Sequence, residues 1–358
     1  MTQRFNITEV TINNFRMFQS LHAADFGQVN LITGRNNSGK TTFLEALFLS
    51  LGPANPQLWM NINARRGLER VGKSATTFPY LFNSLNTEAP ITIDVVTKNY
   101  SSYRLEISNK GAAKDKRIIR EERDSSQEAF YSNSTELKNV LELSFQPKKG
   151  TPIVTTATVD KDGIVFDGEN LNIFPTSVYV SAEAMGSMAL DANRYDELNK
   201  KGLISEFEKS LVFLLPGLKR TSLGIENDVP MIFADVGYGL VPLALLGSGS
   251  RRLASILLAI RNAKNAVALL DEIEYGFHHS VLSGVWNAIT NFCEANNVQV
   301  FATTHSNECI KVASEIFSKK ENSRFQLHRI SHSDGKSELK TFSPSQLEVA
   351  LENELDVR

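Results

Sequence analysis

The chain has 358 residues, of which 42% are hydrophobic and 22% charged, as in an ordinary globular protein. Its 38 basic and 40 acidic residues give a formal net charge of −2, which excludes a general electrostatic attraction to nucleic acid or to an anionic membrane. Two cysteines exclude a disulfide scaffold and a cysteine-rich zinc module. No apolar run approaches the ~20 residues that span a bilayer, and the first residues lack the apolar stretch of a signal peptide. We therefore expect a cytoplasmic protein with a core of its own.

The first half of the chain is rich in predicted strands. Alternating apolar residues predict a strand over residues 5–12, and a short apolar run predicts another over residues 29–33. The spacing then changes to that of a helix over residues 41–51, and residues 54–88 are expected to be irregular. Further strands are predicted over residues 91–97, 103–108, 141–145, 153–159 and 164–166.

A charged segment lies between two of these strands. Residues 110–128 contain six basic and five acidic residues and few apolar ones. This composition favours a solvated hairpin tip or insert, because such a segment cannot bury enough apolar surface to pack. A contact arm for DNA or for a partner protein is the alternative.

The second half alternates between predicted helices and strands. Helices are predicted over residues 193–214, 250–263, 281–295 and 306–317, and strands over residues 267–270, 298–303 and 325–330. Ser343, Pro344 and Gln346 together form a capping-box start for a last helix. Strands that alternate with helices imply a largely parallel sheet with helices on both faces.

The strongest motif is Gly34-Arg-Asn-Asn-Ser-Gly-Lys-Thr41, which matches G-x-x-x-x-G-K-[ST] at every fixed position. It lies between a predicted strand and a predicted helix, where its backbone N–H groups and the helix N-terminus would wrap a phosphate. Lys40 would reach the β- and γ-phosphates, and the Thr41 hydroxyl would ligate Mg²⁺. The residues expected to hold the nucleotide here are Gly34, Asn36, Asn37, Ser38, Gly39, Lys40, Thr41 and Thr42.

Two acidic residues follow the predicted strand 267–270. Asp271 and Glu272 should therefore lie at the carboxyl edge of the sheet, beside the phosphate loop. Asp271 is expected to hold Mg²⁺, and Glu272 to polarise the attacking water, a role worth about 10²–10⁴-fold in rate. The alternative is an acidic pair that caps the next helix. Glu274 adds charge to this cluster but is assigned no role.

His305 follows the next predicted strand, where it could contact the γ-phosphate while Ser306 caps the following helix. A second Gly/Ser loop, Gly247-Ser248-Gly249, opens the helix before the acidic strand and offers another anion site. Because it lies about 200 residues from the first loop, two copies arranged head to tail would share each nucleotide between one copy's phosphate loop and the other's Gly/Ser loop. A plain helix cap is the alternative.

Other candidate residues are weaker. No Cys, His or acidic cluster flanks His278 and His279, so a role in a loop or interface is favoured over metal binding. Trp59 and Trp286 are interpreted as packing residues rather than as platforms for stacking a base.

In this order the motifs resemble the ABC-type ATPase superfamily, in particular its SMC/RecF/OLD branch. Residues 12–18 and the phosphate loop with the start of its helix are similar to the N-terminal lobe of that branch. Gly247–Arg252, Leu269–His278 and Phe301–Cys309 resemble the signature, Walker B/D-loop and H-loop regions of OLD-like AAA-family ATPases, many of which serve bacterial anti-phage defence. The resemblance covers residues 1–50 and 235–315.

The resemblance implies an α/β P-loop fold of ABC type, with a mixed-sheet N-lobe, a strand-rich insert, a helical region and a parallel-sheet core. We expect a single ABC-type ATPase domain over residues 1–358. Its parts are an N-lobe (1–180, including the insert 90–170), a helical signature region (190–263) and a part running from the Walker B strand to the C-terminus (264–358).

The resemblance also assigns roles to individual residues, with ATP and Mg²⁺ as cofactors. Lys40 and Thr41 match the phosphate and Mg²⁺ ligands, and Arg16 matches an N-lobe arginine that can approach the nucleotide. The Walker B acid, the catalytic base and the switch histidine are matched by Asp271, Glu272 and His305. The signature departs from Leu-Ser-Gly-Gly-Gln, because Ser248 lies between Gly247 and Gly249.

The resemblance favours an ATPase that forms a homodimer or higher homo-oligomer on ATP and regulates a separate effector, a nuclease or toxin, in an anti-phage defence system. About 50 residues follow His305, so no Toprim nuclease domain of the OLD type is expected. The alternative is a RecF-like repair or replication ATPase that clamps DNA. Binding to DNA by the chain alone should be weak and salt-dependent, and no membrane association is expected.

Overall fold

The structure is a computed structural model. It describes residues 5–64, 66–67, 75–98, 102–113, 138–160, 163–168, 177–182, 188–263, 265–319, 324–333, 335–353 and 355–358. Of the charged segment 110–128, residues 114–128 lie outside the described residues, so the hairpin-tip prediction for that part is not addressed. Among the described residues, no helix combines the length and apolar character needed to cross a bilayer.

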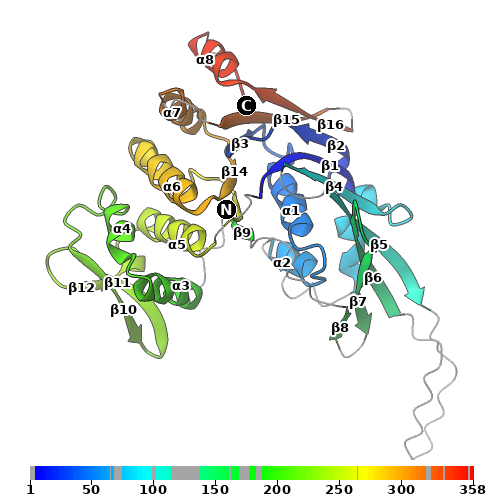
Figure 1. Cartoon of the computed structure of the whole chain (residues 1–358), viewed down its shortest axis with the longest axis horizontal. Coiled ribbons are helices and arrows are strands. Elements are labelled where there is room, and N and C mark those ends of the chain that lie inside the picture. Colours follow the sequence, from blue (N-terminus) through cyan, green and yellow to red (C-terminus); the bar gives the residue numbers. More distant parts are fainter. Residues whose placement is uncertain are drawn as a thin grey trace, which may run out of the picture.

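A parallel sheet lies at the centre of the molecule (Figure 1). Its order in the described chain is β16-β15-β3-β14-β13-β9, and all neighbours are parallel except the pair of β15 and β16. The strands are β3 (Val29–Thr33), β9 (Ser177–Val180), β13 (Val267–Leu270), β14 (Gln299–Thr303), β15 (Phe325–Ser333) and β16 (Lys336–Phe342). The predicted, largely parallel core is therefore confirmed.

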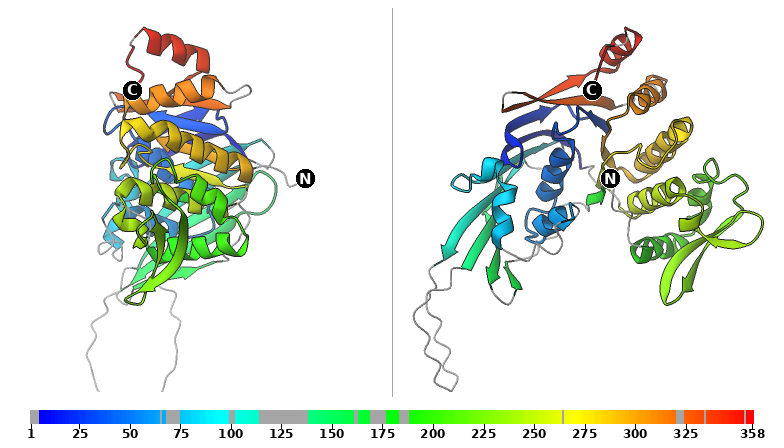
Figure 2. Two further views of the ribbon diagram at one scale, coloured as in Figure 1. Left: turned by 90° about the vertical axis from the view of Figure 1, so that its left-hand side faces the viewer. Right: turned by 180° about the vertical axis from the view of Figure 1, so that it is seen from behind.

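The central strands are buried on both faces, which is why they read as continuous apolar runs. On β13, Ala268 and Leu270 belong to one hydrophobic core, while Val267 and Leu269 belong to the other. Helices cover both faces, as predicted: α1 lies on one side, and α5, α6 and α7 lie on the other (Figures 1 and 2). The bounds are α1 (Lys40–Ser50), α5 (Ser248–Asn262), α6 (Leu282–Asn296), α7 (Asn307–Ser318) and α8 (Pro344–Glu352).

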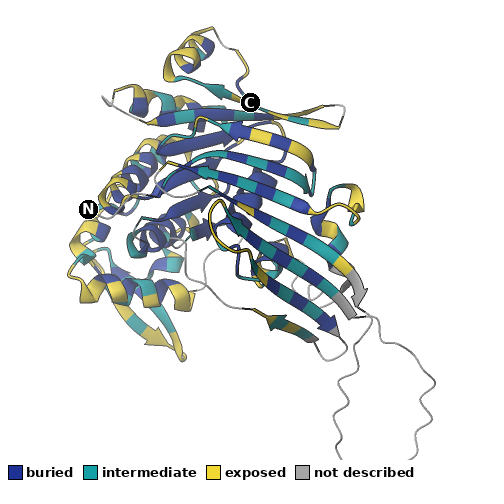
Figure 3. Ribbon diagram, turned by 45° about the vertical axis from the view of Figure 1, so that its right-hand side comes forward, coloured by how far each residue is buried: buried dark blue, intermediate teal, exposed yellow. Residues whose placement is uncertain are grey.

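The N-terminal half contributes an antiparallel sheet of order β2-β1-β4-β5-β6-β7-β8 within the described residues. Its strands alternate buried and partly exposed positions, as β4 does throughout its length (Figure 3). The buried face packs on the side of the core that contains α1. The strands are β1 (Ile7–Phe15), β2 (Phe18–Ala24), β4 (Ile91–Thr97), β5 (Tyr103–Ala113), β6 (Lys138–Pro147), β7 (Ile153–Asp160) and β8 (Gly163–Asp167).

The prediction that residues 54–88 are irregular is wrong. This stretch contains α2 (Leu58–Ala64) and two short 3₁₀ helices, η1 (Ala75–Leu81) and η2 (Asn83–Leu85). Trp59 and Phe78 are fully buried there, with their ring centroids 4.9 Å apart in an edge-to-face contact. Local propensity is weak in this segment, and burial of the two rings against the N-terminal core stabilises these turns.

The predicted helix 193–214 is also wrong in its bounds. The chain forms α3 (Met188–Lys200) and α4 (Ile204–Lys209) instead. Gly202, between them, has φ of 68°, a left-handed conformation that ends a helix and that glycine adopts without a steric cost. The apolar spacing continues across this break because both helices face the same core.

A three-stranded sheet over residues 220–242 was not predicted. It consists of β10 (Arg220–Glu226), β11 (Val229–Asp235) and β12 (Leu240–Pro242), followed by η3 (Leu243–Leu245). Asn227 and Asp228 connect β10 to β11, and both have positive φ, 48° and 63°. Asn-Asp between alternating residues is a turn signal that could have revealed this hairpin.

Both tryptophans are packing residues, as predicted. Trp59 and Trp286 are 0% and 1% exposed, and Trp286 meets Phe317 edge-to-face. The predicted capping box of the last helix is also present, with Ser343 and Gln346 each bonded to the other's backbone N–H.

His328 on β15 is a buried histidine that we expect to make the fold sensitive to acid. Its ring is buried between Thr341 and Asn30, with hydrogen-bond distances of 3.0 and 3.2 Å, and burial lowers the pKa of His328 to about 3. In the unfolded chain the ring protonates near pH 6.5. The stability that the neutral ring contributes is therefore complete above pH 6.5 and is lost as the pH falls toward 3, at ~1.4 kcal/mol for each unit below 6.5.

We expect the free energy of unfolding in urea to fall by ~1–2 kcal/mol between pH 7 and pH 5.5 because of this group. In His328→Gln that part of the pH dependence should disappear, whereas His332→Gln, a change at an exposed histidine on the same strand, should preserve it. Equal pH dependence in the native protein and in His328→Gln would contradict the assignment.

Candidate nucleotide site

The phosphate loop connects β3 to α1, and its backbone conformation requires glycine at two positions. Gly34 and Gly39 have φ of 152° and 105°. A Cβ on Gly34 would lie 2.4 Å from the carbonyl oxygen of Ile330, and one on Gly39 would lie 2.6 Å from the ring of Phe18. Only glycine fits either position. Helix α1 begins at Lys40, so its first N–H groups have no partner within the helix and face the loop.

Lys40 lies across this loop. Its Nζ donates to the carbonyl oxygens of Gly34 and Arg35 at 2.9 and 3.1 Å. Burial lowers the pKa of Lys40, while the nearby Glu272, Asp271 and Glu274 act in the opposite direction. A buried ammonium with only carbonyl partners is well placed to bind an anion that enters the loop.

Thr41 and Asp271 lie in contact although 230 positions separate them. The Thr41 hydroxyl donates to both carboxylate oxygens of Asp271, at 3.2 and 3.1 Å. Thr303 Oγ1 also donates to Asp271, at 2.6 Å, and Asp271 is 6% exposed. A buried carboxylate beside a hydroxyl is the hard oxygen donor set that Mg²⁺ takes, so these residues fit the predicted metal.

Glu272 has an unusual backbone. Its φ is 47°, in the left-handed region that few residues other than glycine adopt, and strain of this kind clusters at functional sites. Its N–H donates to Thr303 Oγ1 at 2.8 Å. Arg252 braces the same turn by donating to the carbonyl oxygens of Asp271 and Glu272, at 2.7 and 3.0 Å. Burial raises the pKa of Glu272, and the charge of His305 partly opposes that shift.

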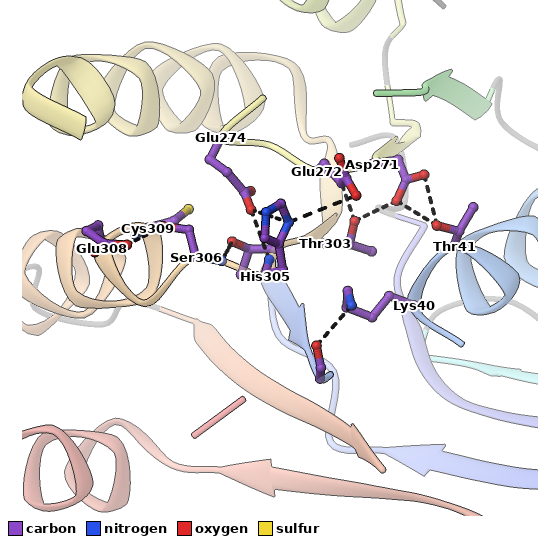
Figure 4. A network of polar contacts seen from close by, with 12 residues as sticks. Lys40, Thr41, Asp271, Glu272, Glu274, Thr303, His305, Ser306, Glu308 and Cys309 are labelled. Atoms are coloured by element: carbon purple, nitrogen blue, oxygen red, sulfur yellow. Dashed lines mark hydrogen bonds and ion pairs between the residues drawn. The ribbon is translucent and has the colours of Figure 1, made fainter. Parts of the chain in front are cut away.

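His305 follows β14 and lies between two glutamates (Figure 4). Its Nδ1 is 3.0 Å from Glu274 Oε1 and 3.9 Å from Glu272 Oε1. Ser306 caps α7 as predicted, because its hydroxyl accepts the N–H of Cys309 at 3.1 Å. The order β3-β14-β13 places the ends of the three strands side by side, and His305 therefore lies between the phosphate loop and the acidic turn.

One cavity of about 920 Å³ joins these parts. It is lined by the predicted residues Arg16, Asn36, Asn37, Ser38, Gly39, Lys40, Thr41, Thr42, Glu272 and His305. Asp271 lies against Thr41, and Gly34 accepts from Lys40 at the base of the loop. Arg66, Tyr80 and Leu85 also line the cavity and were not predicted, because their segment carries no recognisable motif.

A buried carboxylate holds two arginines at this cavity. Glu45, on α1 and 1% exposed, accepts both Nε and Nη2 of Arg66, at 2.7 and 2.9 Å. Arg16 Nε lies 3.3 Å from Oε2 of Glu45, the oxygen that also accepts from Arg66 Nη2, and Arg16 donates to Asn63 at 2.9 Å. Burial lowers the pKa of Arg16, although the charge of the nearby Glu45 carboxylate acts to raise it. Arg16 is thus placed at the cavity, together with a second arginine that sequence reasoning missed.

We expect Arg66→Ala to weaken nucleotide binding by about 10–100-fold, the loss of one charge-assisted contact. Titration with a fluorescent ATP analogue measures the effect. Arg104→Ala is the matched control, because Arg104 makes a similar two-bond pair with Asp94, at 2.6 and 2.9 Å, and does not line this cavity. Native affinity in Arg66→Ala would show that Glu45 holds this arginine for folding alone.

The Gly/Ser loop lies apart from this cavity. Gly247, with φ of 118°, precedes α5, which begins at Ser248, and a Cβ on Gly249 would lie 2.8 Å from the carbonyl oxygen of Gly276. The loop therefore packs on the turn that follows the acidic residues. None of Gly247, Ser248 and Gly249 is among the described residues that line the cavity.

The histidine pair lies on the surface. The rings of His278 and His279 are 4.0 Å apart, and His278 accepts the N–H of Ser280. Within the described residues, no group of three or more His, Cys, Asp or Glu side chains is placed to hold a metal ion.

These features define the class of protein. A strand, a glycine-rich loop and a helix form an anion site, and an acidic turn lies two strands away in the same parallel sheet. The chain has the α/β fold of a P-loop nucleoside triphosphatase, with an antiparallel sheet from its N-terminal half beside the predicted parallel-sheet core.

Sequence comparison identifies the family. Residues 29–310 match the family described as "AAA domain, putative AbiEii toxin, Type IV TA system", and the chain belongs to that family.

Among curated proteins, an "ATP/GTP phosphatase" of Helicobacter pylori is 24% identical over 375 residues, which cover 97% of this chain and 98% of the relative. An uncharacterized protein of Methanocaldococcus jannaschii is 29% identical over 108 residues, 30% of this chain and 49% of that protein.

Solved structures similar to this chain include SMC head domains. One, bound to the C-winged helix domain of ScpA, is 15% identical with a TM-score of 0.48 and covers 97% of this chain and 99% of its own. Another, from Thermotoga maritima, is 13% identical with a TM-score of 0.45, and the match covers 94% of this chain and 99% of that structure's chain.

Proposed function

We propose that this protein is a Mg²⁺-dependent ATPase that dimerises on ATP and thereby regulates a separate effector, a nuclease or toxin, in a prokaryotic anti-phage defence system. The observation that carries the proposal is the single cavity that joins the phosphate loop to Glu272 and His305. The phosphatase name of the Helicobacter pylori relative supports hydrolysis, and the toxin–antitoxin description of the family supports a defence role. We also propose that residues 1–358 act as one ATPase domain.

The side chains of the cavity suggest how hydrolysis proceeds. Lys40 and the N–H groups of the loop bind the phosphates. Glu272 takes a proton from the water that attacks the γ-phosphorus as the bond to the ADP oxygen breaks. Thr41 and Asp271 would hold Mg²⁺, which neutralises phosphate charge. Thr303 fixes both acids, because its hydroxyl donates to Asp271 and accepts the N–H of Glu272.

The position of the Gly/Ser loop supports a shared site. Gly247–Gly249 offers an anion site at the start of α5 but does not line the chain's own cavity within the described residues. Leu245, beside the loop, is 75% exposed. We infer that this surface faces the cavity of a second copy, so that each nucleotide lies between two chains.

Mixing two inactive variants tests this sharing. Lys40→Ala removes the phosphate contact in one chain, and Ser248→Arg blocks the Gly/Ser loop of the other. A mixed dimer retains one composite site with both loops intact. We expect the mixture to recover about one site's ATPase activity. Activity no greater than the sum of the separate variants, once copurification of differently tagged chains shows that mixed dimers form, would contradict a shared site.

The effector is tested by copurification of the native protein with the product of its neighbouring gene, with and without ATP. ATP-dependent association with a nuclease or toxin supports the proposal. ATP-dependent binding to gapped DNA without any partner would instead favour a RecF-like clamp. Cleavage of DNA by the chain alone, lost on mutation of its own acids, would contradict a separate effector.

A further inference from the structure

Glu274 is the acidic residue of the active-site turn to which sequence reasoning assigned no role. Its side chain is only 11% exposed. One of its oxygens, Oε1, accepts the backbone N–H of His305 at 2.9 Å and lies 3.0 Å from the Nδ1 atom of the same histidine (Figure 4). A single carboxylate oxygen thus holds both the main chain and the ring of His305.

These two contacts determine which ring nitrogen is available to a ligand. An ionised carboxylate only accepts hydrogen bonds, so Nδ1 of His305 must carry the proton in this contact. Histidine orientation and tautomer are commonly set in this way, by the partner of the nitrogen that does not meet the ligand. Because His305 lines the cavity, Nε2 is the nitrogen left for it.

The two glutamates of the turn are placed differently. Glu272 Oε1 is 3.9 Å from the ring, beyond hydrogen-bond distance, and its side chain is 37% exposed toward the cavity. The turn that carries both is fixed to β14, because the N–H of Ile273 donates to the carbonyl oxygen of Thr303 at 3.0 Å. Glu274 Oε2 is buried without a protein hydrogen-bond partner in the described structure, an arrangement that costs folding free energy.

We propose that Glu274 is a positioning residue that holds His305 in its Nδ1–H form with Nε2 turned to the terminal phosphate. This inference rests on the proposed ATPase function. Phosphate oxygens only accept hydrogen bonds, so the contact requires a proton on Nε2 as well. The carboxylate behind the ring stabilises that doubly protonated imidazolium by its charge. Glu274 thereby acts on the nucleotide through His305 and touches neither the phosphate nor the attacking water.

The tautomer is measured directly in the nucleotide-free protein. Long-range ¹H–¹⁵N spectra of the full chain with ¹⁵N-labelled histidine, at pH 8, distinguish protonated from unprotonated ring nitrogens, and His305→Gln identifies the signals of His305. We expect the Nδ1–H pattern in the native protein and a shift toward Nε2–H in Glu274→Ala. An unchanged pattern in Glu274→Ala would overturn the proposal. This readout does not depend on ATPase activity, so it separates failure of this inference from failure of the proposed function.

Kinetics supply the second readout. Glu274→Ala should lower kcat for ATP by about 10–100-fold with little change in KM, and Glu274→Gln, which retains an oxygen acceptor for both N–H groups, should recover part of the loss. Glu308→Ala is the matched control, because Glu308 bonds Ser306 beside His305 at 2.8 Å and is exposed. Equal losses in the Ala and Gln variants, or a loss in KM alone, would count against positioning. If Glu274→Ala does not fold, the ¹⁵N spectrum of Glu274→Leu, which fills similar space without an acceptor, decides: a shift toward Nε2–H is expected, and the native pattern would overturn the proposal.

Discussion

Glu272→Gln should lower the kcat for ATP by at least ~10²-fold while nucleotide affinity stays close to native. Glutamine preserves the size of the side chain and an oxygen acceptor, but it cannot take a proton from the attacking water. The Lys40 and Thr41 contacts are untouched, so binding should persist. Since Glu272 lines the cavity while Asp271 is buried against Thr41, removal of its charge should leave the metal ligands in place.

Single-turnover hydrolysis and a separate binding titration distinguish these effects. Because the variant should bind ATP without consuming it, ATP should also trap its dimer, visible by light scattering. Glu308→Gln is the control for removal of one acidic charge near the site, and we expect native kcat from it. A native rate in Glu272→Gln would mean that another group activates the water.

Lys40→Ala should weaken nucleotide binding by at least ~10–100-fold and abolish measurable hydrolysis at ordinary ATP concentrations. Lys40 is 9% exposed, and its ammonium donates to two carbonyl oxygens of the phosphate loop, where water cannot replace it effectively. Calorimetric titration with ATP measures the loss. Lys201→Ala, at an exposed lysine of the α3–α4 turn, is the control.

A stability measurement distinguishes a direct loss of nucleotide binding in Lys40→Ala from a loss caused by unfolding. Burial lowers the pKa of Lys40 in the folded chain, so at neutral pH the charged side chain costs folding free energy. This cost disappears as the pH rises from the lowered pKa to the unfolded pKa. The nucleotide-free Lys40→Ala protein should therefore be no less stable than the native protein in urea. A destabilised variant would show that the contacts with Gly34 and Arg35 outweigh the burial of the charge.

Much of the site could be predicted from the sequence because its parts follow local rules. Gly34 and Gly39 are needed by the backbone of the loop itself, and the buried strands before Asp271 and His305 are short apolar runs. Parallel strands bring their carboxyl ends to one edge, so residues that directly follow such strands meet there. For the same reason, the helices that cover the core sheet lie close to their predicted bounds.

The strands of the antiparallel sheet were mostly predicted, and β4 has the predicted bounds, but two other regions outside the parallel core were not. The short helices over residues 58–85 form because Trp59 and Phe78 pack against the N-terminal core. No periodic pattern of apolar residues in the sequence indicates that contact. The hairpin over residues 220–235 depends on a turn of two left-handed residues, Asn227 and Asp228. In both places long-range packing or a special backbone conformation decides the structure, and local propensity does not.

By itself, the sequence determined the phosphate loop, the acidic turn and His305, since each is a short motif with its own mechanism. Only the tertiary structure decided how they combine. The strand order β3-β14-β13 brings Thr41 to Asp271, Glu45 presents Arg66 at the cavity, and Glu274 holds the ring of His305. Each of these contacts joins residues from different elements. Their geometry is fixed by the packing of whole strands and helices, which no local spacing encodes.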